Sequence, residues 1–210
     1  MIAIIDYGRG NLGSVEKAFE RVGIPATVTE DPRAVDEADA VVLPGDGAFH
    51  DAMSNLAARG LVEPLRRALD GTRPFLGICL GYQLLFSASE EFGDGRGLDV
   101  IAGTVRRFPP GRKVPHMGWN RVAHDGSLAI FAGIPSGAHF YFVHSYYPEL
   151  APGDGGAPAG MKVAWCDYGL RFAAAVQHGR IHATQFHPEK SQRWGLRMLE
   201  NFAALVKDGR

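Results

Sequence analysis

Cys79 stands in a context that is typical of a catalytic nucleophile. The segment Phe75–Leu85 runs from an apolar strand into the cysteine, with glycines at positions 77 and 81 and a helix-like stretch after it. A tight strand-to-helix turn pushes such a side chain to the carboxyl edge of a sheet, where a helix N-terminus favours the thiolate. The Leu80 N–H can then help to hold an oxyanion. The alternative is a small apolar core residue, which we prefer for the mid-strand Cys166.

A cysteine nucleophile needs a base and a group that orients the base. The segment Gln185–Glu189 (Gln-Phe-His-Pro-Glu) offers both, because a strand delivers His187 to the carboxyl end of the sheet. Pro188 keeps the residue before it extended, and side chains two apart in an extended chain point the same way. We therefore expect Glu189 to flank His187 and leave its second ring nitrogen for Cys79. A surface turn with a stray histidine is the alternative for this motif taken alone.

Two glycine-rich turns follow predicted strands. Leu43–Gly47 (Leu-Pro-Gly-Asp-Gly) lies one strand–helix step before the Cys79 strand, and its glycines let the backbone approach a ligand and turn an N–H toward it. We interpret it as the other half of an oxyanion hole, although an ordinary turn is the simpler interpretation by itself. Asp6–Asn11 looks like a phosphate loop but lacks the spacing and ending of nucleotide-binding motifs.

The elements that position these residues alternate in the first half of the chain. Strands that are apolar on both faces and separated by helices predict a parallel sheet covered on both sides. We expect strands at Ile2–Ile5, Ala26–Thr29, Ala40–Leu43 and Pro74–Ile78, and helices from an N-cap at Ser14 to Val22, around His50–Leu56 and at Leu61–Leu69.

The second half reads as strands joined by short turns, closed by a helix. We expect strands at Gly103–Arg107, Trp119–Ala123, His139–Tyr146, Lys162–Asp167, Phe172–Val176 and Arg180–Phe186, then a helix at Trp194–Val206. Antiparallel additions to the parallel sheet are the simplest account. The predicted fold class is therefore α/β, a flavodoxin-like three-layer sandwich with a mostly parallel central sheet and antiparallel additions in the C-terminal half.

Composition restricts the function classes. The 210 residues are 46% apolar with a net charge of −1, which excludes intrinsic disorder and argues against a dedicated nucleic-acid binder. Two cysteines cannot build a disulfide framework, so we expect a reducing, cytoplasmic setting, without a signal peptide or membrane span. The Pro/Gly-rich stretch Gly153–Gly160 is too short to separate domains, so one domain, 1–210, is expected. No cofactor or metal site is predicted.

The motifs resemble those of a known family. Gly77–Gln83 together with His187–Glu189 is similar to the class I (triad) glutamine amidotransferases, and further matches spread over nearly the whole chain resemble the glutaminase subunits of imidazole glycerol phosphate synthase. Those further matches are Asp6–Leu12, Leu43–Phe49, His116–Asn120, Tyr141–Tyr146 and His187–Ser191.

The resemblance implies a reaction and a role for each matched residue. Cys79 would attack the side-chain amide of glutamine, His187 would shuttle the proton, and Glu189 would orient it, giving glutamate and ammonia. The oxyanion would be held by Gly45, Asp46, Gly47 and Leu80, and the glutamine by Gln83, Ser145 and Tyr146. Relatives often carry an apolar residue where Asp46 stands, and we expect its carboxylate to point away from the oxyanion.

The resemblance also implies a partner. Ammonia at neutral pH is mostly ammonium, a poor nucleophile, so productive use needs a docked acceptor enzyme. That acceptor would be the cyclase (synthase) subunit of a heterodimer, which converts a phosphoribulosyl aminoimidazole precursor into imidazole glycerol phosphate and aminoimidazole carboxamide ribotide in histidine biosynthesis. Residues at or near the interface would be Asn11, Trp119, Tyr141 and Lys190.

Two alternatives stay open at this point. One is the glutaminase of another class I amidotransferase, such as the vitamin B6 type or that of GMP or anthranilate synthesis, against which the matches at His116–Asn120 and Lys190-Ser191 count. The other is a non-enzymatic protein of the same fold whose Cys79 senses oxidation. His187 and Glu189 count against it, because a sensor needs no base.

Overall fold

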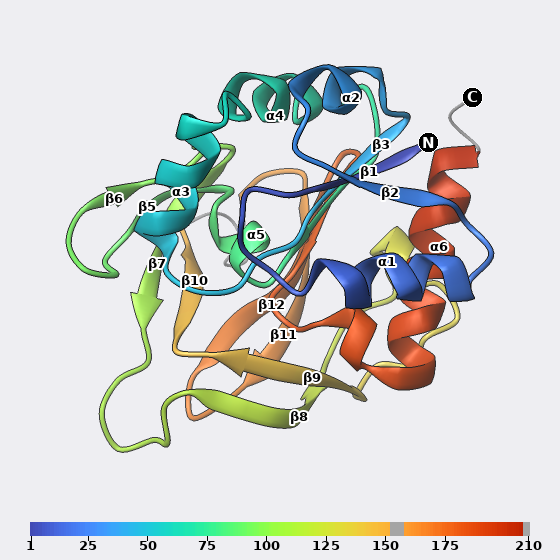
Figure 1. The fold of residues 1–210 in the computed structure, drawn as a ribbon. Helices are drawn as coiled ribbons and strands as arrows, with labels where there is room; N and C mark the ends of the chain where they lie inside the picture. The colour runs from blue at the N-terminus through green and yellow to red at the C-terminus, as the bar shows by residue number, and fades with distance from the viewer. Residues whose placement is uncertain (152–157, 208–210) are drawn as a thin grey trace.

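The computed structural model of the protein describes residues 1–151 and 158–207. A seven-stranded sheet forms its centre (Figure 1). The strand order is β11-β12-β13-β4-β3-β1-β2, with the last five strands parallel and with antiparallel pairing between β11 and β12 and between β12 and β13. Their bounds are Ile2–Ile5 (β1), Ala26–Thr29 (β2), Ala40–Leu43 (β3), Phe75–Ile78 (β4), Met161–Asp167 (β11), Arg171–His178 (β12) and Ile181–Thr184 (β13). The parallel part has the flavodoxin-like order, so the predicted fold class is confirmed.

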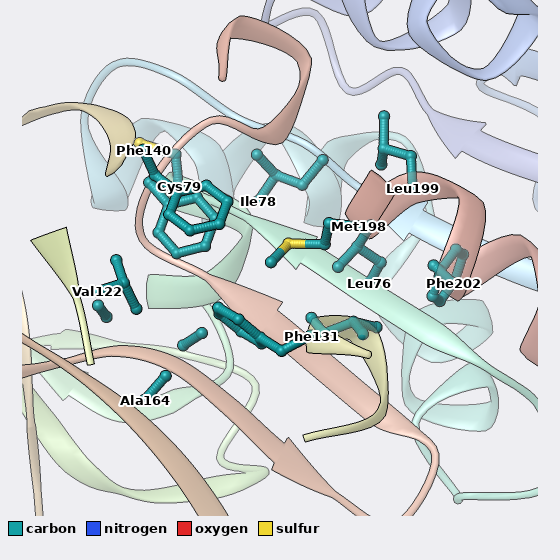
Figure 2. Packing of buried hydrophobic residues seen from close by; sticks show 14 of the residues in the cluster. Leu76, Ile78, Cys79, Val122, Phe131, Phe140, Ala164, Met198, Leu199 and Phe202 are labelled. Carbon is teal, nitrogen blue, oxygen red and sulfur yellow. The ribbon is translucent and has the colours of Figure 1, made fainter. Parts of the chain in front are cut away.

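Helices cover both faces of this sheet (Figure 1). On one face, α1 (Leu12–Arg21) and α6 (Gln192–Lys207) pack on a buried cluster to which β4 contributes Leu76 and Ile78 and α6 contributes Met198 (Figure 2). The other face is covered by α2 (Pro32–Glu37), α3 (Phe49–Ala58) and α4 (Val62–Ala68). Parallel strands with every residue buried, as in β1, β3 and β4, require two such layers.

Not all the later strands join the central sheet, which corrects the simplest account from the sequence. Only β11 and β12 add to it antiparallel, whereas β13 is parallel to β4. A second sheet contains β5 (Phe86–Ser89), β6 (Gly95–Arg96), β7 (Ile101–Arg107) and β10 (Tyr146–Leu150), and a two-stranded ribbon contains β8 (His116–Val122) and β9 (Ala138–His144). The ribbon strands alternate buried and less buried residues, the pattern of a strand with one covered face.

Several element boundaries differ from the sequence predictions. The helix expected from Ser14 begins at Leu12 with Asn11 at its N-cap position, so Ser14 lies inside the first turn. The strand expected at His139–Tyr146 is two strands that break at Ser145. The six-residue α2, with Asp31 capping Arg33 N–H, was too short for its periodicity to stand out.

Two further points concern the chain as a whole. Most of Gly153–Gly160 lies outside the described residues. Within the described part of the chain, no helix is long and apolar enough to cross a membrane.

Candidate active site

A cavity of about 440 Å³ opens where the carboxyl ends of β4 and β13 meet the segment between β9 and β10. Carboxyl ends of parallel strands are where α/β sheets place their sites. The cavity contains Cys79 and His187, two of the three proposed catalytic residues, and several of the predicted binding residues. It is lined by Asp46, Gly47, Cys79, Leu80, Gln83, Glu91, Pro115, Val143, His144, Ser145, Tyr146, His187 and Lys190.

Cys79 occupies a strained turn at the end of β4. Its φ of 56° and ψ of −108° lie outside the regions that L residues prefer, and its N–H donates to Thr184 O at 2.7 Å, which fastens the turn to β13. A Cβ on Gly81 would lie 1.8 Å from Leu43 O, so only glycine permits this close approach. The geometry is that of a nucleophile elbow.

The helix that follows Cys79 is shorter than expected. Helix α5 spans Leu80–Gln83, a single turn. A macrodipole sums aligned peptides, so one turn contributes little of it. The Leu80 N–H, at the first helical position, is still not used by the helix itself. The dipole of a long helix is therefore not available to Cys79.

His187 and Glu189 form a buried pair. Nδ1 of His187 lies 2.8 Å from Oε1 of Glu189, and the two side chains are 6% and 1% exposed. Nε2 of His187 and Oε2 of Glu189 are buried without a hydrogen-bond partner among the described residues. The expected pairing is present, but its predicted cause is wrong: Pro188–Lys190 is a turn of 3₁₀ helix, and this turn, not an extended chain, brings the carboxylate back to the ring.

Charge decides the protonation state of His187. Burial by itself lowers the pKa of His187, but the negative charge of the nearby Cys79, together with the hydrogen bond and charge of Glu189, raises it to about 10. At neutral pH the ring is therefore an imidazolium that faces Cys79 on one side and Glu189 on the other. An imidazolium beside a cysteine stabilises the thiolate, which is the nucleophilic form.

Strand β9 brackets the backbone of His187. The His187 N–H donates to Tyr141 O at 3.0 Å, and the Tyr141 N–H donates to Ser191 Oγ at 3.0 Å. The Ser191 hydroxyl donates in turn to His187 O at 2.6 Å. Three hydrogen bonds thus tie the position of His187 to the ribbon.

The Gly45–Gly47 segment lies on the other side of Cys79. Asp46 and Gly47 line the cavity, and Gly47 has a φ of +90°. Gly45 is buried and does not line the cavity, since a Cβ there would lie 2.3 Å from the Tyr7 hydroxyl and 2.9 Å from Leu80 Cβ. Oδ1 of Asp46 accepts a hydrogen bond from Gly10 N–H at 3.0 Å, so this oxygen faces the loop after β1.

The predicted binding residues Gln83, Ser145 and Tyr146 all line the cavity. Two hydrogen bonds fix the orientation of the Gln83 amide, because Nε2 donates to Tyr146 O at 2.9 Å and to Gln185 Oε1 at 3.0 Å.

Sequence reasoning missed Glu91 and His144. Glu91 Oε2 accepts from Phe49 N–H at 2.7 Å, and burial raises the pKa of its carboxyl. His144 lies within the matched segment Tyr141–Tyr146 but was given no role there, and Glu91 lies in no such motif.

The predicted interface residues are at the surface or at the cavity. Trp119 is 46% exposed, and its ring meets that of Tyr141 edge-on with 6.0 Å between centroids. Lys190 lines the cavity, and Asn11 is exposed before α1. A larger hollow of about 640 Å³ lies beside Trp119 and is lined also by Ser191 and Trp194. It holds neither Cys79 nor His187.

Comparison with known proteins agrees with this geometry. Residues 3–206 match the family described as Glutamine amidotransferase class-I. The chain belongs to the class I glutamine amidotransferase family. The same resemblance inferred from the motifs is thereby confirmed for nearly the whole chain.

Class I amidotransferases of one kind are particularly similar. The imidazole glycerol phosphate synthase subunit HisH of Syntrophotalea carbinolica is 54% identical over 209 residues, covering 96% of this chain and 98% of that protein. The subunit of the same name from Moorella thermoacetica is 53% identical over 206 residues, covering 98% and 95%. A solved structure described as a glutamine amidotransferase shares the fold with a TM-score of 0.75 at 20% identity, covering 99% of this chain and all of that one.

Proposed function

We propose that this class I amidotransferase hydrolyses glutamine to glutamate and ammonia with a Cys79–His187–Glu189 triad, as the glutaminase subunit of imidazole glycerol phosphate synthase. The observation that carries the proposal is Cys79 at a strained strand–helix elbow, in one cavity with a His187 that is paired to Glu189 at 2.8 Å. The names of relatives at 53–54% identity supply the enzyme, imidazole glycerol phosphate synthase, and the resemblance places it in histidine biosynthesis. Residues 1–210 then form one class I domain.

The first half-reaction forms a thioester. The Cys79 thiolate attacks the side-chain carbonyl carbon of glutamine, and the carbonyl oxygen becomes an oxyanion. The N–H groups of Leu80 and of the Gly45–Gly47 segment, including Asp46, hold that oxyanion. Nε2 of the His187 imidazolium then gives its proton to the leaving nitrogen, the C–N bond breaks, and ammonia departs.

The second half-reaction regenerates the enzyme. His187, now neutral, takes a proton from water as the oxygen attacks the thioester carbon. The C–S bond breaks, glutamate leaves, and the thiolate is restored beside the imidazolium. Glu189 keeps its hydrogen bond to Nδ1 in both steps, so that the same ring nitrogen always faces the sulfur.

The remaining polar groups of the cavity match the ends of glutamine. Gln83, Ser145 and Tyr146 hold its backbone groups in this proposal. Glu91 is a carboxylate of the same cavity and complements the α-ammonium group of the substrate, which is a cation. The half-buried Glu91 carboxylate, whose pKa is raised by burial, is thus given a charged partner in this proposal.

Replacing Glu91 by Gln is expected to weaken glutamine binding more than chemistry. The neutral amide keeps the shape but loses the charge that attracts the α-ammonium, so KM should rise about tenfold or more while kcat falls less, since a hydrogen bond to a charged group contributes about 1.5–3 kcal/mol. Glutamate release measured over a range of glutamine concentrations separates the two. An unchanged KM would remove Glu91 from substrate binding. Glu63→Gln, at an exposed position of helix α4, serves as the control.

The partner is the cyclase (synthase) subunit, in a heterodimer in which the ammonia passes directly to the acceptor. Asn11, Trp119, Tyr141 and Lys190 form the proposed contact. Trp119 supports this assignment, because a half-exposed tryptophan packed on a tyrosine is typical of an interface anchor. We also propose a cytoplasmic location, since Cys79 and Cys166 are unpaired thiols, as in reducing compartments.

The chain alone is expected to be nearly inactive, and the synthase loaded with its ligand should switch it on. A peptide next to Gly47 can hold its N–H away from the oxyanion and turn inward at little steric cost. One missing oxyanion donor costs about 3–4 kcal/mol, or roughly 10²–10³ in rate. Asp46 supplies a path to the partner, because its carboxylate is bonded to Gly10, next to the interface residue Asn11.

Glutamate production by the chain alone, by the complex, and by the complex with synthase ligand tests both partner and switch. We expect the third rate to exceed the first by roughly 10²–10³. Similar rates in all three would leave an unregulated glutaminase. Activation by the partner of vitamin B6 or GMP synthesis instead would favour the other class I assignment, and no glutamate in any arm would favour a redox sensor.

A further inference from the structure

Gln185 belongs to the motif that carries His187, yet the proposed mechanism gives it no task. It follows β13 directly, its N–H donates to Ala174 O at 2.8 Å, and its side chain is fully buried. Both ends of its amide are used: Oε1 accepts from Gln83 at 3.0 Å, and Nε2 lies 3.7 Å from Cys79 Sγ as a donor. The amide therefore touches the atom that reacts.

The direction of that amide is fixed from a distance by one carbonyl group. Tyr146 O can only accept, and it accepts from Gln83 Nε2 at 2.9 Å. Gln83 must therefore present its NH₂ end, and the second N–H of that group needs an acceptor, which is Gln185 Oε1. Gln185 is thereby left with its own NH₂ end toward the sulfur. The reversed amide would set two NH₂ groups against each other.

A pair of buried histidines holds the same carbonyl from the other side. His144 Nδ1 lies 2.7 Å from Tyr146 O and must donate to it, so Nε2 of His144 is an acceptor. His116 Nδ1, at 2.9 Å, must then donate to that Nε2, and Nε2 of His116 accepts from Asn120 Nδ2 at 3.2 Å. Asn120 is itself anchored, since Nδ2 donates to Asp167 O at 2.9 Å and Oδ1 accepts from Arg121 N–H at 2.8 Å.

The direction of donation along these hydrogen bonds does not change near neutral pH. Burial lowers the pKa of His116 to about 4 and that of His144 to about 3, so both rings stay neutral and keep one donor and one acceptor each. The rings are also packed in place, with His116 stacked on Tyr168 at 3.9 Å between centroids. A fixed tautomer in both rings makes the donor at Tyr146 permanent.

The sulfur of Cys79 consequently has two different neighbours. Val143 O, at 4.0 Å, suits the thiol because it accepts an S–H. Gln185 Nε2 suits the thiolate because it donates, and a hydrogen bond to an ionised acceptor is about twice as strong as one to a neutral acceptor. One contact therefore favours the Cys79 thiol, and the other favours the Cys79 thiolate.

We infer that Gln185 stabilises and aims the Cys79 thiolate through its amide N–H. The Tyr146 carbonyl, acting through Gln83, sets the direction of that amide, and the hydrogen bonds from Asn120 through His116 and His144 hold this carbonyl in place. The inference rests on the proposed function, in which Cys79 is the nucleophile. It assigns Gln185 to the reacting atom and the other members to positioning.

Alkylation of Cys79 by iodoacetamide, without glutamine, measures the thiolate directly. In a Cys166→Ala background only one thiol can react. Gln185→Met keeps the size and loses the donor, and we expect alkylation at pH 7.5 to slow by about tenfold to hundredfold, the range for a hydrogen bond to a charged group. Gln83→Met keeps Gln185 but frees its amide to reverse, so alkylation should slow less than in Gln185→Met, while KM for glutamine rises. Gln177→Met, on β12 and bonded at both amide ends to backbone, is the matched control.

The outcomes separate cleanly. Gln185→Met alkylated within twofold of the parent, with a Tm lowered only as in Gln177→Met, would make Gln185 a space-filling residue and overturn the inference. If Gln185→Met does not fold, Gln185→Glu takes its place, because it keeps the acceptor for Gln83 and sets an oxygen against the sulfur. With both proteins at pH 8.5, alkylation of Gln185→Glu as fast as that of the parent would then overturn the inference. A parent complex that releases no glutamate refutes the proposed function instead, whatever the alkylation rates.

Discussion

Cys79→Ala is expected to abolish glutamine-dependent synthesis by the complex, while synthesis from added ammonium survives. The methyl group cannot form the thioester, and the loss of a triad nucleophile costs on the order of 10⁶-fold in kcat. The ammonium route uses only the acceptor's site, so it should continue at the rate of the parent complex. Product formation with glutamine and with ammonium, measured on the same preparation, provides the comparison.

Cys166→Ala is the control for this prediction. Cys166 is buried, and burial raises the pKa of its thiol to about 12, so the group stays protonated and unreactive. This variant should keep glutamine-dependent activity close to that of the parent. Normal glutamine hydrolysis by Cys79→Ala would show that the nucleophile has been assigned to the wrong residue, and loss of the ammonium reaction as well would point to damage at the interface.

His187→Asn should lose nearly as much activity as Cys79→Ala, because members of a triad act as a unit. The variant removes both the acid that protonates the leaving ammonia and the imidazolium that faces the sulfur. Glutamate release by the complex is the measurement. His182→Asn is a suitable control, since His182 is a buried histidine on β13 with no place in the mechanism. Activity of His187→Asn equal to that of the control would remove His187 from the mechanism.

Glu189→Gln should lose less, up to about 10⁴-fold, because the carboxylate orients the ring without accepting its proton. The Glu189→Gln substitution should also shift the pH dependence of the rate. Glu189 helps to raise the pKa of His187, so its removal lowers that pKa, and the imidazolium is lost at a lower pH. The alkaline limb of the rate profile should therefore move toward neutral pH. A profile that stays in place would mean that Glu189 has no electrostatic effect on the base.

The chemistry of the site could be predicted from the sequence where it depends on local chain geometry. Cys79 between two glycines at the end of an apolar strand specifies an elbow, and the structure has one. The pairing of His187 with Glu189 was also predictable, but not the 3₁₀ turn that produces it. A proline allows the residue before it to be extended and also begins a helical turn well, so spacing alone does not choose between these outcomes.

The residues that sequence reasoning missed depend on contacts across the fold. Gln185 and Cys79 are 106 positions apart and meet only because β13 and β4 are neighbours in the sheet. Glu91 reaches the cavity from a turn next to the second sheet, which the sequence did not separate from the first. Strand pairing between distant segments leaves no local pattern, so the contact of Gln185 with Cys79 and the position of Glu91 had no signal in the sequence, although Gln185 stands in the motif of His187.

The bracket between Tyr141 and the His187 turn has a mechanical consequence. Tyr141 faces the proposed partner with its ring, while its peptide is bonded to His187 on one side and to Ser191 on the other. A displacement of the Tyr141 ring is thus passed directly to His187 through the hydrogen-bonded backbone of Tyr141 in strand β9. Looseness at the proposed subunit interface would therefore be expected to disturb the orientation of the imidazole, and a tightly docked partner would help to keep the proton donor aligned.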